Sequence, residues 1–160
     1  MRMLLAIYLN DHLAGSTGGH ELAKRAAASN RGNAYGAFLE RLAAEIGEDR
    51  ATLISIMRAL GVRVDRVKVL GGWAAEKVGR LKLNGRVTGY SPLSRVVELE
   101  GLTLGVQGKL ELWRKLDDLE PKPHGLVAFD LPALIRRAER QLQELEEHSR
   151  QSGAEAFARS

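Results

Sequence analysis

Apolar residues recur at three- and four-residue steps along most of the chain, and this spacing predicts helices rather than strands. No stretch of four to eight residues alternates between apolar and polar positions with β-branched enrichment, so we expect no sheet. The sequence therefore predicts an all-α fold, with four long helices in a bundle and one short helix between the second and third of them. The long helices are expected at residues 4–28, 34–60, 92–119 and 130–152, and the short one, capped by Asp65, at 65–83.

Residues with strong positional preferences mark several helix ends. Ser91 and Asp130 are predicted N-caps, because their side-chain oxygens can accept hydrogen bonds from unpaired N–H groups of a first turn. Each is followed within two residues by a proline, which fits that turn. Gly61 is the predicted residue after the second helix. We treat 1–152 as a single bundle domain and 153–160 as a frayed C-terminal tail.

Two of the predicted helices carry glycines at helical spacing. Gly101, Gly105 and Gly108 form a stripe on the third long helix, and Gly15 and Gly18 lie on the first. One face of the first helix is predicted to hold these two glycines together with Leu4, Tyr8, Asp11 and Leu22. Each interior glycine costs roughly 1 kcal/mol relative to alanine, so we predict that the two helices gain by crossing closely. The alternative is that the glycines loosen or kink the helices near a site.

Composition narrows the class of protein. The 160 residues are 44% hydrophobic and 28% charged, which is typical of a soluble domain that buries its own core. The sequence contains no cysteine, so disulfides and thiolate metal sites are excluded, and a cytoplasmic location is expected. The opening apolar run is too short to span a membrane and is interpreted as helix, so no membrane partner is predicted.

Motifs for nucleophilic or nucleotide chemistry are weak. The run Gly15–Gly19 superficially resembles a phosphate loop, but it lacks the Lys-Ser/Thr ending and lies within a helical period. No serine lies in a Gly-x-Ser-x-Gly elbow, and no two histidines have the His-x-x-x-His spacing of a zinc-binding helix. No catalytic residue is therefore predicted, and the sequence leaves open whether the protein is an enzyme.

The order of two long helices, a connection with a short helix, and two more long helices resembles the ferritin-like superfamily. That pattern has one carboxylate on each of two helices and Glu-x-x-His on each of the other two, around a di-metal site. Asp11 and Glu98 match the single carboxylates, and Glu45 begins a Glu-x-x-Glu that lacks the histidine. On the last helix Glu144 and His148 are four residues apart instead of three. The resemblance implies this fold with a degenerate or absent metal site.

Two acidic residues, Asp11 and Asp49, lie on predicted core faces, where an unpaired carboxylate would cost several kcal/mol. One hypothesis is a divalent metal, iron or manganese, bound by oxygen ligands and a histidine. Its candidate ligands are Asp11, Glu45, Asp49, Glu98 and His148. The other hypothesis, which we favour, is a buried polar cluster in which arginines, indole N–H groups or water satisfy the carboxylates. We therefore expect no bound cofactor.

Positive charge is concentrated in one part of the chain. Residues 58–95 contain nine basic and two acidic residues, whereas the last helix is rich in glutamate. Arg80, Lys82 and Arg86 are the candidate partner-binding residues. The match to a helix-turn-helix is poor, so we do not expect nucleic-acid binding. We favour pairing of these cations with the acidic last helix of the same or another subunit.

These observations predict a non-enzymatic ferritin-like helical bundle that acts through protein association, as a homo-oligomer or with another protein. The alternative is a metal-dependent oxidoreductase, or a metal-binding or storage protein, with an altered carboxylate site.

Overall fold

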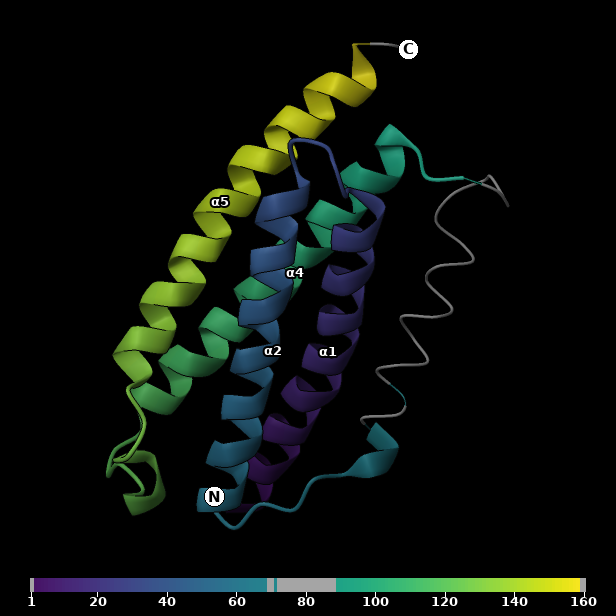
Figure 1. The fold of residues 1–160 in the computed structure, drawn as a ribbon. Helices are drawn as coiled ribbons and strands as arrows, with labels where there is room; N and C mark the ends of the chain where they lie inside the picture. Colours follow the sequence, from purple (N-terminus) through teal and green to yellow (C-terminus); the bar gives the residue numbers. More distant parts are fainter. Residues whose placement is uncertain (1, 69–70, 72–88, 159–160) are drawn as a thin grey trace.

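The computed structural model describes residues 2–68, 71 and 89–158, and every regular element within these ranges is helical. The elements in chain order are α1 (Arg2–Ser29), α2 (Gly36–Ala59), α4 (Pro92–Asp117), the 3₁₀ turn η1 (His124–Leu126) and α5 (Leu131–Phe157) (Figure 1). The predicted all-α fold with four long helices is confirmed.

The four long helices form two antiparallel hairpins, α1 with α2 and α4 with α5 (Figure 1). Helix α1 also packs on α4, while α2 and α5 are joined by ion pairs such as Arg41–Glu144 and Arg140–Glu45. Helices α2 and α4 run in the same direction, so the chain leaves α2 at one end of the bundle and enters α4 at the other (Figure 1).

The predicted signals at the helix starts are in place. The Ser91 Oγ accepts a hydrogen bond from the Ser94 N–H at 3.1 Å, and the Ser94 Oγ accepts one from the Ser91 N–H at 3.3 Å, which makes a capping box for α4. The Asp130 carboxylate caps α5 by accepting from the Ala133 N–H at 2.9 Å. Asp65 accepts from the backbone N–H groups of residues 67 and 68, but most of the predicted short helix lies outside the described residues.

The end of α2 agrees with the prediction and that of α5 does not. Gly61 follows α2 with φ +69°, and the next N–H bonds to the Met57 carbonyl at 2.8 Å, as in a Schellman motif. Helix α5 continues to Phe157, past the predicted end at residue 152. Its last turns are held because Glu155 accepts hydrogen bonds from Gln151 and from Arg95 of α4.

The turn η1 lies against the C-terminal end of α2. A Cβ on Gly125 would lie 2.5 Å from the Ala59 carbonyl oxygen, so only glycine fits this close approach. The next residue, Leu126, is 1% exposed and joins the core. The connection between α4 and α5 therefore closes one end of the bundle.

The side of α4 that carries recurring apolar residues is buried in the core. Burying such side chains contributes about 1.5–3 kcal/mol each. The apolar residues that recur at three- and four-residue steps along α4 form an apolar stripe, and each is at most 3% exposed, namely Leu99, Leu102, Val106, Leu110, Trp113 and Leu116. They belong to one cluster with buried residues of α1, α2 and α5.

The predicted core face of α1 is partly wrong. Leu4 is 70% exposed and Asp11 and Gly15 are exposed, whereas Leu9 and Leu13 are fully buried. The spacing of apolar residues did not identify the buried face, because α1 carries apolar and small residues on several of its sides. Its buried side even includes a polar residue, Asn10, whose amide donates to the Arg63 carbonyl at 3.0 Å and accepts from the Asp65 N–H. Asn10 thereby fastens the chain after α2 to α1.

Candidate functional site: a groove between α1 and α4

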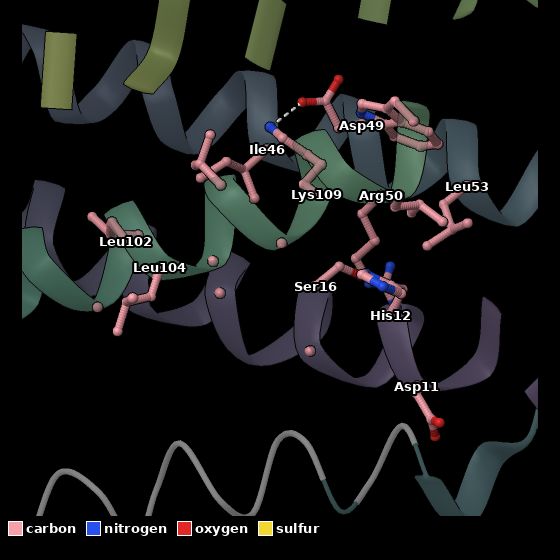
Figure 2. A pocket seen from close by; sticks show the side chains of 18 of the residues that line it. Asp11, His12, Ser16, Ile46, Asp49, Arg50, Leu53, Leu102, Leu104 and Lys109 are labelled. Atoms are coloured by element: carbon pink, nitrogen blue, oxygen red, sulfur yellow. Dashed lines mark hydrogen bonds and ion pairs between the residues drawn. The ribbon is translucent and has the colours of Figure 1, made fainter. Parts of the chain in front are cut away.

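A groove of about 410 Å³ opens between α1 and α4, and α2 forms its inner side (Figure 2). Most of its lining is apolar, from residues such as Ile46, Leu53 and Leu102. The polar groups of the lining come mainly from Asp11, His12 and Ser16 of α1, and from Asp49, Arg50 and Lys109. This mixture of an apolar wall with a few polar groups is typical of ligand sites.

Four of the five glycines predicted to pack helix against helix line this groove instead, namely Gly15, Gly101, Gly105 and Gly108. A Cβ on Gly15, Gly105 or Gly108 would meet no atom within 4 Å. Among the stripe on α4, only Gly101 faces a neighbour, the end of the Leu22 side chain at 3.2 Å. The predicted close crossing is therefore wrong at these positions, because the missing side chains leave open space. The alternative, that the glycines lie beside a site, agrees better with this geometry.

Asp49, one of the candidate ligands, is buried at the inner side of the groove, as predicted. Its carboxylate accepts from the Lys109 ammonium at 2.5 Å (Figure 2) and from Arg137 at 3.1 Å. Lys109 also donates to Gln141, whose side-chain NH₂ group donates to Glu45 at 2.7 Å. Burial lowers the pKa of the Lys109 ammonium, and the neighbouring Asp49 carboxylate partly opposes this shift. We call these five residues the polar chain.

The sequence predicted arginine, indole groups or water as partners of Asp49; the arginine is confirmed by Arg137, but the lysine was missed. A lysine beside an apolar stripe normally extends into water, and Lys109 gives no sequence signal that it does otherwise. The three long helices that supply the polar chain, α2, α4 and α5, are instead cross-linked by it.

Asp11 differs from its predicted position on the core face. It lies at the groove's outer edge, where its exposed carboxylate pairs with Lys68 at 2.7 Å. The exposure follows from the rotation of α1, which turns Leu9 and Leu13 inward. Asp11 and Asp49 thus both line the groove but are bound by different cations.

The remaining candidate ligands lie away from the groove. Glu98 accepts from Arg25 at 3.0 Å and from the Tyr90 hydroxyl at 2.9 Å. The His148 ring stacks on Phe38, with centroids 4.0 Å apart. Within the described ranges, no three His, Asp or Glu side chains are grouped so that they could hold a metal ion. The candidate partner-binding residues Arg80, Lys82 and Arg86 lie outside those ranges.

Arg50 and His12 are polar groups of the groove that were not predicted, and Trp113 supplies one of the indole N–H groups that were expected to bind the buried carboxylates. The Arg50 Nε donates to the Thr17 hydroxyl at 3.1 Å. His12 packs edge-on against Tyr8, and burial lowers its pKa, so its ring is neutral at pH 7. Trp113 is 1% exposed, and in the part of the chain that the structure describes its indole N–H has no hydrogen-bond partner. Arg50 directly follows Asp49, which lies on the predicted core face of α2, so the sequence indicated only a surface position for Arg50.

Comparisons with known proteins leave the functional assignment to this geometry. No protein-family model matches the sequence, no curated protein matches it, and no solved structure matches the fold. Among the described helices, none combines the length and the apolar character that crossing a bilayer requires.

Proposed function

We propose that this protein is a non-enzymatic helical bundle of ferritin-like arrangement that acts by binding a small apolar ligand in the groove between α1 and α4. The observation that carries the proposal is the open space over the helical glycines Gly15, Gly19, Gly105 and Gly108. Each glycine costs about 1 kcal/mol relative to alanine, and no close helix packing offsets this cost. An occupant that lies against the exposed backbone would offset it.

The size and lining of the groove support a small organic ligand. Sites of this kind occupy roughly 300–1,000 Å³ and are mainly apolar with a few polar groups that orient the ligand. The groove, at about 410 Å³, falls within this range and has such a lining.

The polar chain supports a binding role over catalysis. The Asp49 carboxylate is bound by Lys109 and Arg137, so protein cations compensate the charge that a metal ion would compensate in a ferritin-like metal site. The parallel direction of α2 and α4 supports the ferritin-like arrangement, since bundles of this type have one long crossover connection.

The binding proposal is tested by titrating the protein with Nile red, a neutral apolar dye. We expect saturable binding to the wild type and at least tenfold weaker binding to Gly105→Leu, whose side chain would enter the groove. The matched control is Gly153→Leu on α5, where a Cβ would make only an ordinary contact with Phe157 at 3.8 Å. Equal affinities of the two variants for the dye would refute the proposal.

Protein association, predicted from the sequence, is a second proposal. It is supported by large apolar side chains that remain exposed on α1 and α4, such as Leu4 at 70% and Leu104 at 75%. Sedimentation of the wild type and of Leu4→Glu at micromolar concentration tests it. We expect an oligomer that the glutamate weakens, and a wild-type monomer would contradict the proposal.

A further inference from the structure

Some of the charged side chains that line the groove form ion pairs with other residues of the protein, and one does not within the part of the chain that the structure describes. The Asp11 carboxylate lies 2.7 Å from the Lys68 ammonium, and Asp49 is bound by Lys109 and Arg137. Both carboxylates of the lining are therefore neutralised by cations of the protein. A cationic ligand would have to compete with those existing pairs.

Arg50 is the exception. Its Nε donates to the neutral hydroxyl of Thr17, and within the described ranges no carboxylate forms an ion pair with its guanidinium. Figure 2 shows the Arg50 side chain extending from α2 toward Ser16 and His12 of α1. Its terminal nitrogens remain able to donate two parallel hydrogen bonds, the geometry that matches a carboxylate.

The groove also holds a buried donor without an acceptor. Trp113 lines the groove and is 1% exposed, and its indole N–H has no partner in the described part of the protein. An indole N–H can only donate, and leaving such a group buried and unpaired costs about 1–3 kcal/mol. Both carboxylates of the lining are already paired with cations of the protein, whereas the terminal nitrogens of Arg50 and the indole N–H of Trp113 are donors that a ligand's acceptor atoms could bind.

The rest of the lining fits an extended apolar body. The groove follows α4 from Gly101 to Trp113, which at 1.5 Å per residue is about 18 Å of helix. Along this length the glycines expose backbone, while Leu102, Leu104 and Leu112 supply apolar walls.

We infer that the ligand is an apolar carboxylate, whose hydrocarbon chain lies along the glycines of α4 and whose carboxylate binds Arg50. This inference rests on the proposed function and names the ligand class of the same groove. It requires no covalent step, since the ligand is held by ion pairing, hydrogen bonds and burial of its chain.

Calorimetric titration with decanoate and with decanol tests the inference, because the two share a chain and differ in the charged head. We expect the wild type to bind decanoate at least tenfold more tightly than decanol. Arg50→Gln should weaken decanoate binding roughly tenfold to a hundredfold, as loss of charge-assisted hydrogen bonds predicts, and leave decanol unchanged. Arg58→Gln, an exposed site on the same helix outside the groove, should change neither.

Arg50→Lys keeps the charge but not the paired donors, so it should bind decanoate with intermediate affinity. This variant keeps the test informative if Arg50→Gln does not fold. Equal binding of decanoate and decanol, with Arg50→Gln unchanged, would overturn the carboxylate inference and leave the binding groove in place. If Gly105→Leu and Gly153→Leu bound Nile red with equal affinity, the proposal that the groove binds a ligand would itself be refuted.

Discussion

Alanine at position 105 should stabilise the protein. Gly105 is exposed within α4, and a Cβ built there meets no atom within 4 Å. The substitution therefore gains the difference in helix propensity, about 0.8–1.0 kcal/mol, without a steric cost. For a chain of this length, that increase in unfolding free energy raises the melting temperature by about 2–4 °C. Urea and thermal unfolding followed by circular dichroism would measure both quantities.

Two other glycines provide matched controls for this prediction. At Gly101 the added Cβ would lie 3.2 Å from the movable end of Leu22, so the propensity gain should be largely cancelled. At Gly125 it would lie 2.5 Å from the backbone oxygen of Ala59, so alanine should destabilise by about 1–3 kcal/mol. If Gly105→Ala lost as much stability as Gly125→Ala, α1 and α4 would have to cross closely and the groove would not exist.

Further predictions concern the polar chain, a buried histidine and the link after α2. Lys109→Met should lower the unfolding free energy by about 3 kcal/mol, because it removes a cation from buried Asp49. The double variant Lys109→Met with Asp49→Leu should recover most of this lost stability. If urea unfolding showed that the losses of the two substitutions simply add, the prediction would be contradicted. Burial lowers the pKa of His12, so the unfolded chain binds more protons and stability should fall as the pH drops through about 6.5 toward the lower folded pKa. His12→Gln should reduce the change in melting temperature between pH 7 and 5, and an unchanged slope would refute this. Asn10→Ala should destabilise by about 1–3 kcal/mol and speed hydrogen exchange at the Asp65 amide, and unaltered exchange would show that the side-chain bond is not needed.

The helices and their starts could be predicted because their signals are local. Ser91 and Asp130 cap the turns that directly follow them, and the α4 stripe from Leu99 to Leu116 is read within one helix. The rotation of α1 could not be read in this way. Its small and apolar residues surround the helix, so contacts with α2 and α4 decide that Leu9 faces inward and Leu4 outward.

The site was less predictable because it depends on where separate helices lie. The sequence singled out Asp49 as a buried acid, but its two cations, Lys109 and Arg137, come from positions 60 and 88 residues further along the chain. The glycine stripe was recognised, yet the same pattern is compatible with close packing or with an open groove. Only the separation of α1 and α4 distinguishes the two, and no residue spacing within either helix reports that separation.

The polar chain also restricts how this core can evolve or be redesigned. Its hydrogen bonds form only when α2, α4 and α5 have one relative rotation and one relative shift along their axes, so it selects a single register among the packings that leucines alone would allow. Replacing one residue of the polar chain leaves its neighbours in the chain buried without a hydrogen-bond partner. Sequence changes at Glu45, Asp49, Lys109, Arg137 and Gln141 should therefore occur as coordinated sets. A bundle in which all five were made apolar together would keep its helices and lose the device that fixes their alignment.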